Sequence, residues 1–224
     1  LTSWNTDILR SELSGPHKAF FILTNSRGLN QEKALALSRE LSQNLSDAAK
    51  SINIPVSIVS RSDSTLRGHF PAEVDEVAAT MGNSDLPYLI CPFFLEGGRF
   101  TINDIHYVSD EDLLIPAAMT PYARDASFGF TQSDLRLWVE EKTKGRITAD
   151  KVVSISIDDI RAGGPDKIRD ILLEVEKKSA CVVNAVSYRD IEVVVKGLLD
   201  ARKKGKHFLY RTAASFVRVR AGIT

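Results

Sequence analysis

Apolar runs of strand length alternate with amphipathic stretches along the whole chain. Short apolar runs predict strands at Ala19 to Thr24, Val56 to Val59, Tyr88 to Phe94, Val152 to Ile157, Cys181 to Ala185 and Phe208 to Tyr210. Helical spacing of apolar residues predicts helices over Gln31 to Lys50, Pro71 to Met81, Ser133 to Lys142, Pro165 to Lys177, Tyr188 to Arg202 and Ala213 to Arg220. The alternation predicts an α/β fold, in which a mostly parallel sheet carries helices on both faces.

One long segment breaks this alternation. Residues Leu95 to Thr131 contain glycines and prolines, and their apolar positions have only weak periodicity. A long irregular segment inside a compact domain is usually functional or forms a small subdomain. We therefore expect an irregular insertion after the third strand.

Composition and charge narrow the class of protein. A chain of 224 residues buries roughly 70% of its unfolded surface, so it needs no disulfide or metal to fold. The formal net charge of zero argues against nucleic acid or an anionic membrane as a partner. Cys91 and Cys181 lie in apolar runs, which favours buried free thiols in a reducing cytosol. No apolar stretch approaches the roughly 20 residues of a membrane span, and no signal peptide is visible, so a cytoplasmic protein is expected.

The densest polar motif is Arg61 to Gly68, which reads Arg-Ser-Asp-Ser-Thr-Leu-Arg-Gly. It follows a predicted strand and precedes a predicted helix, and such turns lie at the edge where α/β sheets bind ligands. Arg61 and Arg67 supply planar charged groups for a carboxylate or phosphate. The hydroxyl groups of Ser64 and Thr65 suit sugar oxygens, and a helix start adds unpaired N–H donors. The motif predicts a site for a small hydroxylated anion; the alternative is a polar helix cap with a structural ion pair.

A second motif, Glu96 to Thr101, directly follows the third strand. Gly97 and Gly98 permit close approach of the backbone to a ligand. Arg99 and Thr101 repeat the combination of a guanidinium group with a hydroxyl group. Neighbouring parallel strands would bring this motif beside the first one, whereas a plain Gly-Gly turn is the alternative.

Two further groups of polar residues follow. Arg211 and Thr212 stand between the last strand and its helix, where either a ligand contact or a Thr212 helix cap would fit. The insertion carries Asp104, His106, Tyr107, Thr120, Tyr122, Arg124 and Asp125. No zinc-ligand spacing, phosphate-binding glycine loop or nucleophile elbow is found.

Together these motifs resemble the four-carbon acid sugar kinases, long classified as a domain of unknown function (DUF1537). The resemblance rests on three ordered blocks: Ser-Arg-Ser-Asp-Ser-Thr-Leu-Arg-Gly-His-Phe, then Pro-Phe-Phe-Leu-Glu-Gly-Gly-Arg-Phe-Thr with Asp-Ile-His-Tyr, then Tyr-Arg-Thr-Ala-Ala-Ser. It runs from about Phe20 to Ile223. Members are similar in having an N-terminal sugar-acid-binding domain and a C-terminal nucleotide-binding domain, and they phosphorylate acids such as erythronate, threonate or 3-oxo-tetronate with ATP.

The chain departs from this family at both ends. Family members usually open with a strand leading into an Asp-Asp-x-Thr-Gly element, and nothing before Trp4 matches it. The chain also stops at Thr224, where the linker to the nucleotide-binding domain would start. We therefore expect residues 1–224 to form the sugar-acid-binding (substrate) domain of a two-domain kinase, without its first strand and its nucleotide-binding domain.

The resemblance also implies roles for individual residues. Asp63 and Arg67 are the expected catalytic residues, with Asp63 as the base for the attacking hydroxyl group. The expected substrate-binding residues are Arg61, Ser64, Thr65, Gly68, Gly97, Gly98, Arg99, Thr101 and Arg211. Arg61, Arg67 and Arg99 are expected to bind the substrate carboxylate. ATP and Mg²⁺ are implied as cofactors, bound mainly outside this chain, and no metal ligand is assigned within it.

Two alternative functions stay open. The chain could be a stand-alone module that binds a small hydroxy acid without turning it over. A hydrolase or aldolase that uses Ser64 or the pair His69 and His106 is disfavoured, because no base, oxyanion element or nucleophile stands at a recognisable spacing. The nucleotide-binding domain and a small hydroxylated acid are the expected partners, and a homodimer is left open.

Overall fold

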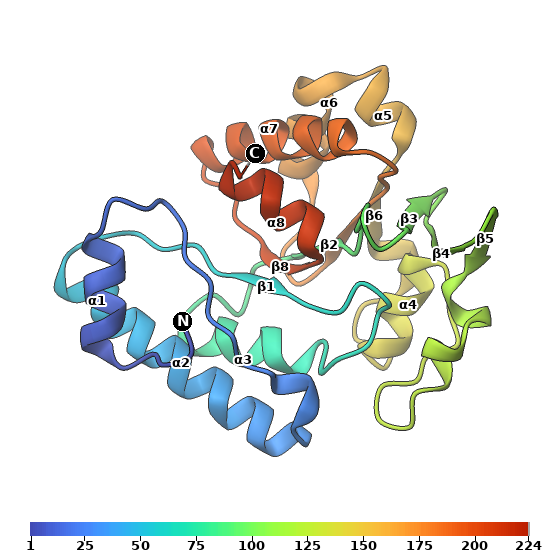
Figure 1. Ribbon diagram of the computed structural model, residues 1–224. Coiled ribbons are helices and arrows are strands. Elements are labelled where there is room, and N and C mark those ends of the chain that lie inside the picture. Colours follow the sequence, from blue (N-terminus) through green and yellow to red (C-terminus); the bar gives the residue numbers. More distant parts are fainter. Residues whose placement is uncertain (224) are drawn as a thin grey trace. The chain divides into compact units, whose positions relative to one another are not determined.

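The computed structural model describes residues 1–223, which form two compact units (Figure 1). The first unit comprises Leu1–Ile58 and Gly68–Ser84. The second comprises Val59–Arg67 and the chain from Asp85 onward. None of the described helices is both long enough and apolar enough to cross a bilayer.

The first unit is built from helices. They are α1 (Thr6–Ser14), the short 3₁₀ turn η1 (Ser26–Gly28), α2 (Gln31–Ser51) and α3 (Ala72–Thr80). Asn5 and Asn30 cap α1 and α2, because each side chain accepts a backbone N–H bond of 2.9 Å from the first turn. Leu9, Leu45 and Ala48 form the centre of its apolar cluster.

Two strand predictions fail in this region. Ala19 to Thr24 contains no strand: Phe20 and Ile22 pack against the cluster around Leu9, while Phe21 and Leu23 are each 53% exposed. The alternating apolar residues of this segment therefore pack against helices α1 and α2, and the segment does not pair with a strand. The predicted strand Val56 to Val59 is displaced, because Val56 and Ile58 also join this cluster and pairing begins only at Val59.

The second unit contains the predicted parallel sheet. Its strands are β1 (Val59–Arg61), β2 (Tyr88–Cys91), β6 (Val152–Ile155), β7 (Ala180–Val183) and β8 (Leu209–Thr212), in the order β1-β8-β2-β7-β6. Each pair of neighbours is parallel. The last residues of β1 and β2, Arg61 and Cys91, both align with Thr212 of β8. The carboxyl ends of these three strands therefore meet at one edge.

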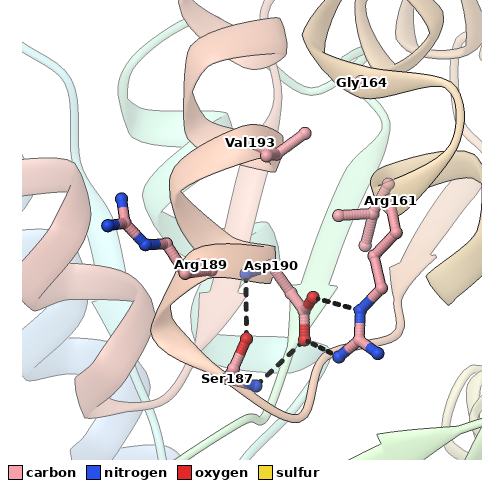
Figure 2. Close-up of a pocket in the computed structure, with 7 residues that line it drawn as sticks. Arg161, Gly164, Ser187, Arg189, Asp190 and Val193 are labelled. Atoms are coloured by element: carbon pink, nitrogen blue, oxygen red, sulfur yellow. Dashed lines mark hydrogen bonds and ion pairs between the residues drawn. The ribbon is translucent and has the colours of Figure 1, made fainter.

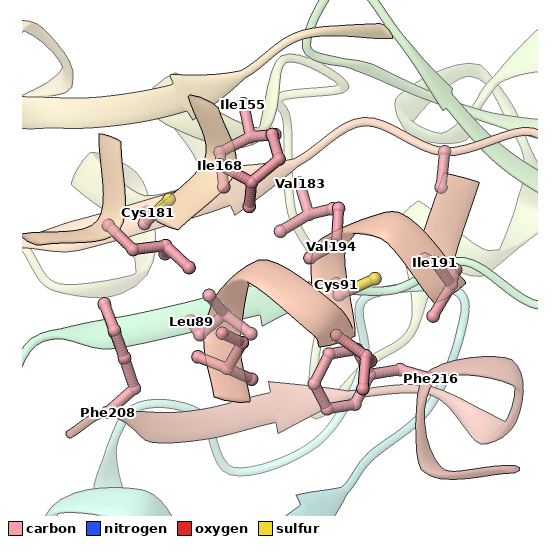
Figure 3. Close-up of a cluster of buried hydrophobic side chains, with 14 of the residues drawn as sticks. Leu89, Cys91, Ile155, Ile168, Cys181, Val183, Ile191, Val194, Phe208 and Phe216 are labelled. Atoms are coloured by element: carbon pink, nitrogen blue, oxygen red, sulfur yellow. The ribbon is translucent and has the colours of Figure 1, made fainter. Parts of the chain in front are cut away.

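Helices cover both faces of this sheet, as predicted. On one face lie α6 (Gly164–Glu174), α7 (Tyr188–Lys203) and α8 (Ala214–Ala221), with α5 (Ile157–Arg161) beside them. Figure 3 shows the core that they share with the strands, which includes Leu89, Cys91, Cys181, Val183, Ile168, Val194 and Phe216. The helix α4 (Leu135–Lys142) and the 3₁₀ turn η4 (Ala149–Lys151) precede β6. Side chains alternate along β8, so Tyr210 enters the α6–α8 core whereas Arg211 lies against Trp138 of α4.

The two cysteines are free and buried, as the sequence predicts. Both are 0% exposed within the α6–α8 core. Burial raises the pKa of the Cys91 thiol to about 12 and raises the pKa of Cys181 as well. Both therefore act as small apolar side chains of the core.

The predicted irregular insertion contains a second sheet. Its antiparallel strands are β3 (Arg99–Ile102), β4 (Ile105–Asp110) and β5 (Leu113–Pro116), followed by the 3₁₀ turns η2 (Ala117–Met119) and η3 (Pro121–Arg124). The first hairpin turns at Asn103 and Asp104, which both have positive φ angles, of 50° and 65°. Two consecutive left-handed residues are typical of tight hairpins with Asn or Asp at the turn. The Asn103-Asp104 dipeptide is therefore the sequence signal for this hairpin, which the weak periodicity of the apolar residues does not reveal.

Candidate functional site

The loop that follows β1 is shaped by Asp63. The Asp63 carboxylate accepts backbone N–H bonds from Thr65 at 3.2 Å and Arg67 at 3.3 Å, and the Thr65 hydroxyl group also donates to it. At the start of the loop, the Ser62 N–H donates to the Thr212 carbonyl of β8 at 2.8 Å. Leu66 is fully buried with a φ angle of 68°, a conformation that non-glycine residues adopt only where their surroundings impose it. Asp63 thus fixes a tight loop at the carboxyl edge of the sheet.

Arg67 closes this loop and is held from several sides. Its Nε and Nη2 atoms donate to the two Asp63 carboxylate oxygens at 3.0 and 3.2 Å. Its Nη1 atom lies 3.7 Å from the Asp125 carboxylate, and its guanidinium group lies 4.9 Å from the centre of the Tyr122 ring. Burial opposes the charge of Arg67, but the Asp63 hydrogen bond and charge still raise its pKa. The guanidinium group is therefore a fixed cation whose side chain is 20% exposed.

Arg99 lies on the same tyrosine. Its guanidinium carbon is 5.4 Å from the centre of the Tyr122 ring, and Nη2 donates to the Tyr122 hydroxyl group at 3.5 Å. Nη1 donates to the carbonyls of Gly97 and Gly98, and the buried Nε atom has no partner among the described residues. Arg99 and Tyr122 line a cavity of about 370 Å³ together with Val108, Ser109, Asp110, Ile115, Met119, Thr120 and Pro121.

His106 connects the β3–β4 hairpin to the loop after β1. It is fully buried, with Nε2 at 2.7 Å from the Ser64 carbonyl and Nδ1 at 3.0 Å from the Thr101 hydroxyl oxygen. Because a carbonyl oxygen only accepts, Nε2 carries the proton and Nδ1 accepts from Thr101. Burial, together with the charges of Arg211 and Arg99, lowers the pKa of His106 to about 4. His106 is therefore a neutral clamp that joins two parts of the site.

Arg211 completes the cluster from β8. It is 0% exposed, and its guanidinium carbon lies 5.1 Å from the centre of the Trp138 ring. Nη2 donates to the Arg67 carbonyl at 3.3 Å, while Nε and Nη1 have no partner among the described residues. Burial lowers the pKa of Arg211 to about 10, although the Asp63 carboxylate opposes this change. The cluster thus contains one deeply buried cation whose hydrogen bonds are incomplete.

Asp104 has a structural role at the hairpin turn. Its backbone N–H donates to the Asn184 side-chain oxygen at 2.8 Å, and the Asn184 amide donates back to the Asp104 carboxylate at 2.8 Å. The Ser154 hydroxyl group also donates to Asp104. These bonds join the hairpin to the ends of β6 and β7, so they fix the position from which β3 presents Arg99.

The sequence profile of the sugar-binding N-terminal domain family matches residues 3–220. The chain belongs to this family. The match confirms the resemblance to the N-terminal domain of the four-carbon acid sugar kinases. No curated protein sequence gives a significant match.

Solved structures of the DUF1537 family share the fold of this sugar-binding domain. A Haemophilus influenzae protein of that family has 18% sequence identity and a TM-score of 0.64, over 94% of this chain and 49% of its own. A Bordetella bronchiseptica DUF1537 protein, a domain-swapped dimer with bound citrate, has 21% identity and a TM-score of 0.65, over 94% of this chain and 48% of its own. The chain therefore spans about half the length of these structures.

The sugar-binding domain brings some of the predicted site residues together. Asp63, Arg67, Arg99 and Arg211 meet around Tyr122, Trp138 and His106. Ser64 contributes its carbonyl to this cluster. Thr65 and Thr101 are 2% and 0% exposed, and their hydroxyl groups contact Asp63 and His106 respectively.

The remaining predicted residues lie apart or have another role. Arg61 is exposed at the end of β1, and Gly68, with a φ angle of 114°, belongs to the first unit. A Cβ atom on Gly97 would lie 2.4 Å from the Phe94 ring, and one on Gly98 would lie 2.8 Å from the Ser109 Cβ. Packing inside the hairpin therefore already requires both glycines. The sequence places Tyr122 and Asp125 only in the insertion, whereas the structure brings both to Arg67.

A second cavity, of about 400 Å³, lies where α5, α6 and α7 meet (Figure 2). Arg161 donates from Nε and Nη2 to the two carboxylate oxygens of Asp190, at 2.9 and 3.2 Å. Asp190 also accepts N–H bonds from Val186 and Ser187 at 3.0 Å, and the bond from Ser187 belongs to the capping box of α7. This junction satisfies its charges internally, so we interpret it as structural.

Proposed function

We propose that this sugar-binding domain is the substrate-binding part of an ATP-dependent kinase that phosphorylates four-carbon sugar acids of the erythronate, threonate or 3-oxo-tetronate type. One observation carries the proposal. Three guanidinium groups from separate segments, Arg67, Arg99 and Arg211, converge beside the carboxyl ends of β1 and β8. This is the edge at which open α/β sheets bind ligands.

The chemistry of the cluster suits a hydroxylated carboxylic acid. Guanidinium groups recognise a carboxylate through paired hydrogen bonds. The Tyr122 hydroxyl group and the Asp63 carboxylate offer polar contacts for hydroxyl groups of the substrate. The Bordetella relative holds citrate, a small hydroxylated acid, which supports this class of ligand. The four-carbon size and the use of ATP come from the family resemblance, and the domain-swapped dimer of that relative supports a homodimer here.

ATP and Mg²⁺ do not fit the described residues alone. Residues 1–223 offer no group of three His, Cys, Asp or Glu side chains arranged for a metal ion, and the sequence has no glycine-rich phosphate loop. We therefore assign no step through either cofactor to these residues. Their contribution to phosphoryl transfer would be to bind and orient the acid, which is the main demand of this reaction.

Asp63 and Arg67 are proposed to act in that orientation. In the structure the Asp63 carboxylate is bound by Arg67 and by Thr65, so its first effect is to hold Arg67 in place. We further propose that Asp63 accepts the proton of the attacking hydroxyl group. An Asp63→Asn variant tests this role in the natural full-length protein: turnover at saturating acid should be lost, beyond any fall in acid affinity that follows from the weaker hold on Arg67.

Isothermal titration of this chain with D-erythronate, L-threonate and 3-oxo-tetronate tests the binding function. Erythritol, which has the same carbon number and no carboxylate, is the matched control. We expect binding of at least one acid and no binding of erythritol. Absence of binding for all three acids contradicts the proposal.

The kinase step is tested separately, by mass spectrometry of the acid after incubation with MgATP and the natural full-length protein. A product heavier by one phosphoryl group supports the kinase. Acid binding without any phosphorylated product would instead support a binding module.

A further inference from the structure

The three arginines of the cluster differ in how their charges are satisfied. Arg67 faces two carboxylates, Asp63 and Asp125. Arg99 donates to two carbonyls and to the Tyr122 hydroxyl group. Arg211 has neither arrangement, because its one described hydrogen bond is to the Arg67 carbonyl, at 3.3 Å.

The environment of Arg211 makes this incomplete pairing costly. The side chain is 0% exposed, and its Nε and Nη1 atoms are buried without a described partner. A buried charge is normally paired and fully hydrogen-bonded, since desolvation without compensation is strongly unfavourable. The Trp138 ring face stabilises the cation through a cation–π contact, but it does not replace the missing hydrogen-bond acceptors of Nε and Nη1. An unsatisfied buried group of this kind needs a reason beyond packing.

The surroundings carry charges of both signs. Lys142, at the end of α4, is half-buried and donates to the Gly129 carbonyl at 2.9 Å. Burial lowers the pKa of Lys142 and the charge of Arg211 lowers it too, whereas the carboxylates of Glu141 and Asp125 raise it. The Asp63 carboxylate likewise opposes the effect of burial on the pKa of Arg211. An anion at Arg211 would therefore act mainly by supplying the missing hydrogen bonds.

We propose that Arg211 is the residue that anchors the carboxylate of the bound acid, an assignment that rests on the proposed function of this domain. The carboxylate takes the place of the Arg67 carbonyl, because the guanidinium cation binds a negatively charged acceptor more strongly than a neutral carbonyl oxygen. Arg67, whose guanidinium group faces Asp63 and Asp125, and Arg99, which leaves its Nε atom without a described partner, border the ligand and orient its hydroxylated chain. The sequence motifs had instead favoured Arg61, Arg67 and Arg99 for the carboxylate.

Two variants distinguish an anchoring role from a structural one. Arg211→Met removes a buried charge and keeps an apolar stem beside Trp138, whereas the control Arg67→Met leaves the Asp63 carboxylate without its cation. If Arg211 is the anchor, the ligand-free Arg211→Met protein should melt at or above the wild-type temperature, and Arg67→Met should melt below it. Titration with D-erythronate, L-threonate and citrate should show affinity reduced at least 100-fold in Arg211→Met.

Arg211→Lys provides a second measurement, which holds even where the Met variant fails to fold. It keeps the charge and loses the planar donors, so affinity for the same acids should fall at least tenfold. Wild-type affinity in Arg211→Lys, or acid binding within threefold of wild type in Arg211→Met, would overturn the assignment while the proposed function stands. Wild-type protein that binds none of the acids would overturn the proposed function itself, and the assignment with it.

Discussion

Two arginine-containing regions of the second unit satisfy their charges in opposite ways. At the junction of α5 and α7, Arg161 pairs through two hydrogen bonds with Asp190, and its side chain remains 55% exposed. At the carboxyl edge of the sheet, Arg211 is 0% exposed and leaves two nitrogens without described partners. Both regions lie beside a strand-to-helix connection, so position in the fold alone does not separate them.

The difference supports the proposal that the sheet edge, and not the junction, binds a ligand. A paired and solvated arginine gains little from an added anion, because its carboxylate partner already balances its charge and water screens it. A buried arginine with unmatched donors gains a partner when an anion arrives. The size of a cavity is a weaker guide here, since the cavity at the junction and the one lined by Arg99 and Tyr122 have similar volumes, of about 400 and 370 Å³.

The largest effect is expected from Arg67→Ala. Its removal leaves the Asp63 carboxylate, whose side chain is 14% exposed, without its cation and releases the loop after β1. Sugar-acid affinity, measured by titration, should fall at least 100-fold, and the free energy of unfolding should fall by about 1–3 kcal/mol.

Arg161→Ala is the matched control for that change. It removes an arginine of the junction that also binds an aspartate, but it leaves the sheet edge intact. Its affinity for the acid should equal that of wild type. Unchanged affinity in Arg67→Ala, or a large loss in Arg161→Ala, would contradict the division between the two regions.

Asp190→Asn should lower stability without changing acid affinity. Asp190 is 2% exposed, caps α7 and accepts both hydrogen bonds of Arg161. The amide cannot accept all of these bonds, so urea denaturation should show a loss of about 1–2 kcal/mol. A parallel loss of acid affinity would show that the junction and the ligand site are coupled.

The sequence predicted the parallel sheet well, because β2 and β7 are continuous apolar runs buried on both faces. It failed for Ala19 to Thr24, since an alternating apolar pattern does not reveal whether its partner is a strand or a helix. It also missed the strands of the insertion, which are only four to six residues long and in which Thr101 and His106 direct polar side chains inward.

The sequence predicted only part of the candidate site, because tertiary contacts determine the rest. The residue types alone show that the motif around Asp63 combines charged and hydroxyl-bearing side chains. It did not identify which arginine is neutralised, because Asp125 and Tyr122 reach Arg67 from more than fifty positions away along the chain. Nor does the sequence indicate that Arg211 is fully buried against Trp138. Such tertiary contacts determine the electrostatics of the site.

A pH effect of moderate size is expected from His106. Its pKa is lowered from 6.5 to about 4 by burial, so the folded state binds fewer protons than the unfolded state between these values. Stability should therefore be complete above pH 6.5 and decline on acidification toward pH 4. Between pH 7 and pH 5 the loss should be on the order of 1–2 kcal/mol by urea denaturation.

The variant His106→Gln should make stability less dependent on pH in this range, because glutamine cannot titrate. His17→Gln is the control, since His17 is exposed. If the pH dependence of His106→Gln equals that of wild type, His106 is not the clamp that joins the hairpin to the loop after β1.

The smallest effect is expected from Arg218→Ala on α8. Arg218 donates to the Glu96 carboxylate and to the Tyr188 hydroxyl group, both at 3.2 Å, and the Arg218 and Glu96 side chains are 44% and 50% exposed. Exposed pairs contribute little, because water and salt screen them. The melting temperature should stay within about 2 °C of wild type, and acid affinity should be unchanged. A large loss of affinity would mean that Glu96, in the turn that leads into Arg99, must be held by α8 for the arginine cluster to form. An exposed and paired arginine would then also contribute to the ligand site, which contradicts the division between the two regions.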